Sequence, residues 1–329
     1  DPQGNRINGL KLPGERFLKP QLNHTPVNAV TTRISAICYF WPIMNIAELQ
    51  FKPLDLDGVK TLVKWAHGEG WNPGHYDADV FYAADTGGFY GFYDNNELVA
   101  GGSIVSYGGE FGFMGLFIVK HEYRSAGIGR KLWYLRRDAL LSRLNKGASI
   151  GMDGVVAMQP FYAKGGFNIA FRDERYVITG KACTLHDRIS PISKDDTEQV
   201  LAYDTACFGY ARQQFMMPWL QLPGNKTFKY VEDGVLKGFA VVRKLIRGYK
   251  IGPLFAENGA VAEELFKACL NAVQGEELYI DIPVCNAYAL QMVRKYNAGY
   301  VFECARMYCG TPPAIDMNKV FGITSFELG

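Results

Sequence analysis

The sequence has almost no excess of charge of either sign. Its 329 residues include 35 lysines and arginines and 33 aspartates and glutamates. Nucleic acids and anionic membrane surfaces attract chains with a strong basic excess, and this chain has none. We therefore expect neither as a partner, and any charged ligand must bind at a local site.

Residues that ligate metals are few and scattered. Five histidines and seven cysteines occur along the chain, without the spacing of a metal site. We therefore expect no metal centre. An odd number of dispersed cysteines also favours a reducing compartment over a disulfide framework, which predicts a cytoplasmic protein.

Long apolar runs are missing as well. The run "AICYFWPIM" at residues 36–44 is too short to cross a bilayer and contains a proline. It closes a stretch, residues 1–45, that is rich in proline, asparagine and glycine and predicts an irregular N-terminal extension. With 48% hydrophobic residues, the rest of the chain is typical of a globular protein and long enough for two domains.

The first half of the chain predicts alternating strands and helices. A strand at 47–54 precedes a helix in which Val59, Leu62, Val63 and Ala66 repeat at helical spacing. Turn signals "DNN" and "YGG" then divide residues 87–123 into three strands. Further along, the pattern predicts a helix from about residue 128, a strand at 149–158, a short helix at 159–167 and a strand at 168–180.

The second half repeats this order of elements. It predicts helices at 194–208, 286–297 and around Val261 to Ala272, a helix-like segment within 207–224, and strands at 226–233, 235–246, 250–255, 277–284 and 299–310. Two units of similar order indicate a duplicated α/β (α+β) domain. We place the domains at 46–180 and 181–312, with a C-terminal tail at 313–329.

A glycine-bearing turn stands out within the first unit. The stretch "RSAGIG", residues 124–129, lies between a strand and an amphipathic helix that carries Ile128, Leu132, Leu135 and Ala139 on one face, with Arg136 among the arginines assigned to other faces. Glycines there let backbone N–H groups at the helix start approach a ligand, and such groups favour an anion. No G-K-[ST] follows and no G-x-G-x-x-G opens the first unit, which argues against a nucleotide fold.

The residues "GLFIVKHEYRSAGIGRKLW" resemble the acetyl-coenzyme A signature of the GNAT acetyltransferase superfamily, R/Q-x-x-G-x-G/A, through Arg124, Gly127 and Gly129. "PFYAKGGF" is similar to the tyrosine-bearing helix that closes the family's cofactor site. The resemblance covers residues 46–180. Residues from about 250 look like the degenerate second domain of tandem members, where the signature is missing. The implied fold is two tandem GNAT-like domains, each a mixed, mostly antiparallel sheet flanked by helices.

The resemblance implies that acetyl-coenzyme A is the cofactor. The turn would hold its pyrophosphate, and the preceding strand would pair with its pantetheine arm, with an N–H of Ile118 or Val119 polarising the thioester oxygen. Phe117 and Val119 share a strand face, which also suits plain core residues. The implied cofactor-binding residues are Phe117, Ile118, Val119, Arg124, Ser125, Ala126, Gly127, Ile128, Gly129 and Arg130.

For catalysis, the resemblance implies that Tyr162 protonates the departing thiolate; the alternative is an ordinary packing tyrosine. A carboxylate on the fourth strand is common in the family, yet "FGFMGLF" has none. Glu110 and Asp153 are candidate bases acting through a water, or simply turn and strand-end residues, and the chain need not contain a base at all.

The expected activity is transfer of an acetyl group to a small-molecule or peptide amine by direct attack on the thioester. The alternative is a protein that binds or senses acyl-coenzyme A with little turnover. Aromatic residues between the first helix and the second strand suit either an acceptor pocket or core packing; they are Trp71, His75, Tyr76, Phe81 and Tyr82. The sequence does not predict an oligomeric state.

Overall fold

The computed structural model describes residues 48–329. The extension expected at residues 1–45, with its apolar run, lies outside the described residues. Within them, every helix is too short or too polar to cross a bilayer.

The strands of the described residues form one sheet, ordered β1-β2-β3-β4-β5-β12-β6-β11-β10-β9-β8-β7, with β13 paired to β10. Most neighbours are antiparallel; β4 with β5 and β10 with β11 are parallel. The strands are β1 Gln50–Pro53, β2 Phe89–Asp94, β3 Glu97–Tyr107, β4 Phe111–Val119, β5 Ser149–Val155, β6 Asn168–Thr179, β7 Ile189–Pro191, β8 Lys226–Glu232, β9 Val235–Lys244, β10 Tyr249–Ala256, β11 Glu277–Pro283, β12 Gly299–Cys309 and β13 Val320–Gly322.

Helices pack on this sheet in the order that the apolar periodicity predicted. They are α1 Leu56–Gly68, α2 Asp77–Ala84, α3 Ile128–Leu141, α4 Gln159–Lys164, α5 Thr197–Phe208, α6 Gln213–Leu220, α7 Gly259–Ala272 and α8 Ala287–Lys295. α2 was not anticipated. It is short and buries Ala78, Val80, Phe81 and Ala84, so apolar residues on several sides hide its helical period.

Two tight turns fix the hairpins. Asn95 and Asn96 have φ of 45° and 72° between β2 and β3, and Asp233 and Gly234 have φ of 51° and 77° between β8 and β9. Asparagine, aspartate and glycine adopt this left-handed region more easily than other residues, and it suits two-residue hairpins. The turn at "DNN" was predicted from the sequence and is confirmed, and the second turn joins the strands predicted at 226–233 and 235–246.

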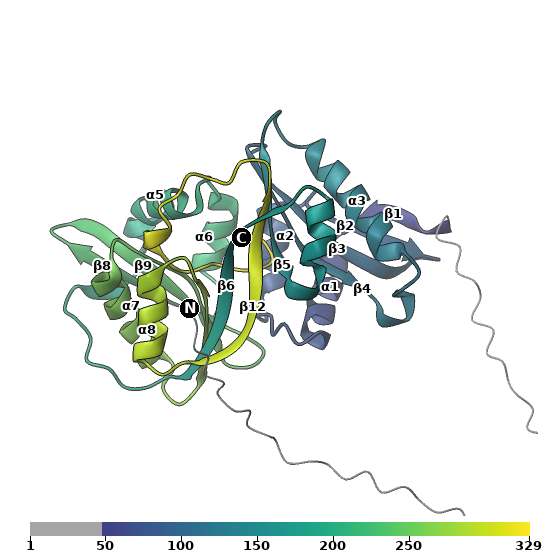
Figure 1. The fold of residues 1–329 in the computed structure, drawn as a ribbon. Coiled ribbons are helices and arrows are strands. Elements are labelled where there is room, and N and C mark those ends of the chain that lie inside the picture. The colour runs from purple at the N-terminus through teal and green to yellow at the C-terminus, as the bar shows by residue number, and fades with distance from the viewer. Residues whose placement is uncertain (1–47) are drawn as a thin grey trace, which may run out of the picture. The chain divides into compact units, whose positions relative to one another are not determined.

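The two halves of the chain exchange their last strands. β12 lies between β5 and β6, and β6 lies between β12 and β11. Figure 1 shows β6 and β12 running side by side through the middle of the sheet. Each half therefore completes its sheet with a strand from the other half, and the sheet is continuous across them.

The buried face of the amphipathic helix α3 differs from the predicted one. Leu135 and Ala139, assigned to the apolar face, are partly buried, whereas Trp133 and Arg136 are fully buried. Arg136 donates from Nη2 to the carbonyl oxygen of Gly115 at 2.8 Å and also to that of Ser103. These carbonyl acceptors allow a cation on the core side of the helix, which corrects its assignment to an outer face.

Candidate active site

A cavity opens where β4 separates from β5. The two strands pair only from Phe111 with Ser149 to Met114 with Met152, and beyond Met114 the side of β4 that faced β5 lines a cavity of about 800 Å³. Leu116 has φ of 46°, and the β3–β4 register shifts beside it, so a bulge turns β4 away from its neighbour. Beyond Met114 the splayed strand no longer pairs with β5, which leaves room for an extended ligand beside it.

The glycine-bearing turn forms one end of this cavity. α3 begins at Ile128 with Gly127 as its N-cap, at φ of 84° and with no side-chain capping hydrogen bond. Lys131 N is the first amide to bond back, to the carbonyl oxygen of Gly127 at 3.2 Å. The N–H groups before it thus have no intrahelical acceptor and can bind an anion.

The two arginines of the turn have different roles. Arg124 donates from Nε to the carbonyl oxygen of Val119 at 2.9 Å and is ion-paired with Glu69 at the end of α1. Arg130 is exposed and lines the cavity. Arg124 therefore braces the turn, and Arg130 is the better placed to add charge for an anion.

Tyr162 lies on the wall of the same cavity, on α4. Its ring is buried and stacks against Trp133 with centroids 6.1 Å apart. Burial raises the pKa of its hydroxyl to about 12, although the nearby Arg136 lowers it. The phenol therefore keeps its proton at any physiological pH, as a proton donor must.

The structure brings most of the predicted residues together. The cavity is lined by Phe117, Ile118, Val119, Arg124, Ser125, Gly129, Arg130, Asp153 and Tyr162. Ala126, Gly127 and Ile128 do not line it; Ile128 is fully buried in the core beneath the turn. Glu110 is also elsewhere, on the exposed β3–β4 turn at the far end of β4, so it is not placed to act as a base in this cavity.

Asp153 reaches the cavity but is engaged. Both of its carboxylate oxygens accept from Arg306 of β12, at 2.7 Å from Nε and 2.9 Å from Nη2. Burial raises the pKa of Asp153 to about 6, and Arg306 opposes that rise. A carboxylate held by two charge-assisted hydrogen bonds is poorly placed to accept a proton from a substrate.

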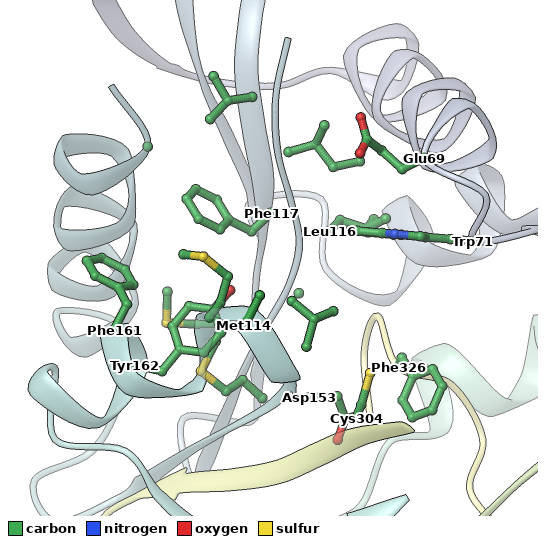
Figure 2. Close-up of a pocket in the computed structure, with 18 of the residues that line it drawn as sticks. Glu69, Trp71, Met114, Leu116, Phe117, Asp153, Phe161, Tyr162, Cys304 and Phe326 are labelled. Atoms are coloured by element: carbon green, nitrogen blue, oxygen red, sulfur yellow. The ribbon is translucent and has the colours of Figure 1, made fainter. Parts of the chain in front are cut away.

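The far end of the cavity is aromatic and comes largely from the second half of the chain. Trp71, Phe302 and Phe326 line it, and Phe302 and Phe326 have ring centroids 5.9 Å apart. Figure 2 shows Tyr162 and Phe117 on one side of the cavity, with Trp71 and Phe326 on the other. Of the aromatic residues proposed for an acceptor pocket, only Trp71 lines it: Phe81 is core, Tyr82 packs against that core, and His75 and Tyr76 are exposed.

The C-terminal segment, predicted only as a tail, supplies part of this wall. Phe326 and Glu327 line the cavity. Glu327 is bound through its carbonyl oxygen to Ser103 Oγ at 3.2 Å, and the carbonyl oxygen of Leu328 accepts from Tyr107 at 2.7 Å. These residues could not be identified from local sequence patterns, because they lie more than 200 positions from the strand they touch.

In the second half, the slot that corresponds to the opening between β4 and β5 lies between β10 and β11 and is closed. β10 and β11 pair in parallel only from Tyr249 to Ile251, and β13 then pairs with β10 at Leu254 and Phe255. At the start of α7, the Asn258 side chain accepts from Ala260 N and Val261 N at 3.0 and 3.1 Å. The slot and the helix N-terminus that are open in the first half are thus filled by the chain itself.

Comparison with known proteins assigns both halves to the same family. Residues 56–167 match the profile described as Acetyltransferase (GNAT) family, and residues 200–322 match an Acetyltransferase (GNAT) domain. The holothin acyltransferase of Pseudoalteromonas sp. (strain SANK 73390) is 33% identical over 281 residues, covering 84% of this chain and 94% of the relative.

Solved structures share the fold. A structure from Pyrococcus horikoshii, provisionally described as an acetyltransferase, has a TM-score of 0.75 at 21% identity and covers 87% of this chain and 98% of its own. A tandem GNAT protein from the clavulanic acid biosynthesis pathway has a TM-score of 0.56 at 12% identity, with 81% and 100% covered. The chain belongs to the GNAT acetyltransferase family, as a tandem member and an acyltransferase.

Proposed function

We propose that the protein is an N-acetyltransferase that uses acetyl-coenzyme A in its first half. One observation carries the proposal: a single cavity joins the open N-terminus of α3, the free side of β4 beyond Met114 and Tyr162. The pyrophosphate would bind the N–H groups of Ser125 to Arg130, with charge from Arg130. The pantetheine arm would extend along Phe117 to Val119.

The chemistry follows from this placement. The acceptor amine attacks the thioester carbonyl, and an N–H of Ile118 or Val119 stabilises the negative charge that develops on its oxygen. The C–S bond then breaks, and Tyr162 gives its proton to the departing thiolate. Because the hydroxyl has a raised pKa, it recovers that proton readily from solvent.

We propose a small-molecule amine as the acceptor. The relative named for holothin acylation supports a small molecule over a peptide. The aromatic end of the cavity, with Trp71, Phe302 and Phe326, suits an amine attached to a flat ring. A peptide amine is the alternative acceptor.

Isothermal titration calorimetry with acetyl-coenzyme A, paired with thiol release across a panel of amines, tests the proposal. We expect one site per chain, because β13 and Asn258 fill the second slot, and amine-dependent thiol release. Two equivalent sites would contradict the one-site proposal. Tight binding without thiol release from any amine would favour the alternative function, an acyl-coenzyme A sensor.

A further inference from the structure

Three carboxylates line the cavity, and they differ in their partners. Glu69 is ion-paired with Arg124, and Asp153 is ion-paired with Arg306. Glu327 differs from both, because its Oε2 is buried and has no hydrogen-bond partner among the described residues. A buried carboxylate oxygen without a donor is costly, so its presence needs a reason.

The backbone of Glu327 lies against the splayed part of β4. A Cβ added to Gly115 would lie 2.0 Å from the carbonyl oxygen of Glu327, so only glycine at position 115 lets the C-terminal segment approach so closely. Gly115 lies within the stretch of β4 that lacks a carboxylate. Glu327 therefore brings a carboxylate to the strand from outside it.

The segment that carries Glu327 is held at several points. Arg212 donates to Thr324 Oγ1 at 2.7 Å and to the carbonyl oxygen of Gly329 at 2.8 Å, and Leu328 N donates to Ser325 Oγ at 3.1 Å. With the bonds from Ser103 and Tyr107, these contacts fix the backbone on both sides of Glu327. The backbone that carries Glu327 beside the cavity is therefore fixed, which is one requirement for a preorganised site.

Two cations, Arg175 and Lys250, lie close enough to Glu327 to interact with it. Arg175 and Lys250 both pair with Asp281. Glu327 interacts electrostatically with both cations, and Asp153 is the nearby acid that opposes it. Asp153 is itself ion-paired with Arg306, which reduces its repulsion of Glu327.

We propose that Glu327, from the end of the second half, binds the acceptor's ammonium group and takes protons from its nitrogen before and during acyl transfer in the first half. This inference rests on the proposed N-acyltransferase function. It assigns to the C-terminal segment the carboxylate that β4 lacks and makes the active site a product of both halves.

The proton balance is complete with groups already named. An ammonium has no lone pair for attack, so Glu327 first takes one proton from it and passes that proton to solvent. Glu327 takes a second proton as the resulting amine forms its bond to the acyl carbon, and Tyr162 donates one as the C–S bond breaks. The products are an amide and a free thiol. Glu327 then loses this second proton to solvent and Tyr162 regains one, so acylation of an ammonium releases one net proton and needs no further reactant.

Turnover of two probe amines tests the role in proton transfer. Benzylamine is protonated at neutral pH, whereas aniline is not. For Glu327→Gln we expect thiol release with benzylamine at pH 7 to fall by about 10²- to 10⁴-fold. The loss should shrink at alkaline pH and be smaller for aniline, and Glu327→Asp should restore part of the rate. Equal losses for both amines at every pH would overturn the proposal.

Binding tests it without turnover. In the presence of coenzyme A, we expect the wild type to bind benzylammonium at least about 10-fold more tightly than benzyl alcohol, measured by NMR titration, because the ammonium makes a charge-assisted hydrogen bond. Glu327→Gln should lose this preference. Glu276→Gln, on an exposed turn, should keep it.

Acetyl-coenzyme A binding and the preference for benzylammonium are separate properties of the protein. If acetyl-coenzyme A does not bind the wild type, the proposed function is wrong. If acetyl-coenzyme A binds but Glu327→Gln keeps the preference for benzylammonium, the assignment of Glu327 is wrong while the function stands. A wild type without preference for the ammonium also overturns the assignment.

Discussion

Asp153 and Arg306 form a bidentate ion pair that joins the two halves of the chain beside the active-site cavity. The pair links β5 of the first half to β12 of the second, with donor–acceptor distances of 2.7 and 2.9 Å, and both side chains are buried. Breaking such a pair leaves one charge buried without compensation.

Arg306→Met should therefore lower the free energy of unfolding by about 3–5 kcal/mol. Arg247→Met is the matched control, because Arg247 also pairs bidentately with Glu277 but is exposed, and its loss should cost about 0–1 kcal/mol. Urea unfolding measures both. Asp153→Leu combined with Arg306→Met should recover part of the loss; an additive double variant would show that the pair is not the cause.

Substitutions at the two glycines of the turn should affect different properties, stability at Gly127 and cofactor affinity at Gly129. Gly127 has φ of 84°, so Gly127→Ala should lower the unfolding free energy by about 1–2 kcal/mol. A Cβ on Gly129 would only touch Phe117 and Val119 at 3.4 Å, so Gly129→Val should fold. Its side chain would intrude into the cavity, and we expect calorimetry to find at least about 10-fold weaker acetyl-coenzyme A binding. Normal affinity in a folded Gly129→Val would contradict the phosphate site at this turn.

Removing one oxygen tests the proton donor. Tyr162→Phe keeps the ring that stacks on Trp133, so acetyl-coenzyme A affinity should not change. The single-turnover rate should fall by about 10²- to 10⁴-fold if proton transfer limits it. Because the pKa of Tyr162 is about 12, the wild-type rate should show no loss from its ionisation below pH 10. An unchanged single-turnover rate in the variant would return Tyr162 to a packing role.

Asp173 and Asp281 should respond to pH with opposite signs. Burial, then the nearby Asp153, raises the pKa of Asp173 well above its usual range, and its two oxygens have no partner among the described residues. The contribution of Asp173 to the free energy of unfolding is thus fully present below the unfolded-state pKa of about 4. It is lost as the pH rises through the folded-state pKa. The asparagine in Asp173→Asn cannot ionise, so this variant should be more stable than the wild type near pH 7. The difference in unfolding free energy should be smaller, or zero, near pH 4.

For Asp281, burial raises the pKa, but Arg175 and Lys250 outweigh burial and lower it to about 2. Its contribution is present above the unfolded pKa and is lost as the pH falls through about 2. Asp281→Asn should therefore be destabilised near pH 7, with the deficit shrinking in acid. Urea unfolding at several pH values compares the two variants; the same sign for both would contradict the charge assignments.

Local patterns made much of the fold predictable. The hairpin turns at Asn95 and Asp233 and the turn at Gly127 need backbone conformations that few residue types adopt, so their sequences show where they are. The cofactor site could be predicted for the same reason, because the residues from Phe117 to Arg130 are contiguous. Tyr162 lies only one strand and one short helix further on.

Contacts between distant parts of the chain were not predictable. In the sequence, Arg136 is simply a polar residue of an amphipathic helix. Nothing there shows that its guanidinium donates to the carbonyl oxygen of Gly115. Glu327 meets Ser103 across 224 positions. One signal could have pointed there: Gly115 interrupts an apolar strand, and an isolated glycine in a strand often marks a close backbone approach.

The exchange of β6 and β12 has a consequence for how such a chain could have arisen. A single half produced alone would present the edge of β5 or β11 without its neighbour, and unpaired edges recruit strands from other molecules. A second copy of the same half offers the right strand in return, which is a reciprocal, strand-swapped homodimer. The present chain has the same arrangement with both halves on one polypeptide. The second half can therefore lose its own ligand slot and still be needed for β12, which completes the sheet of the first half.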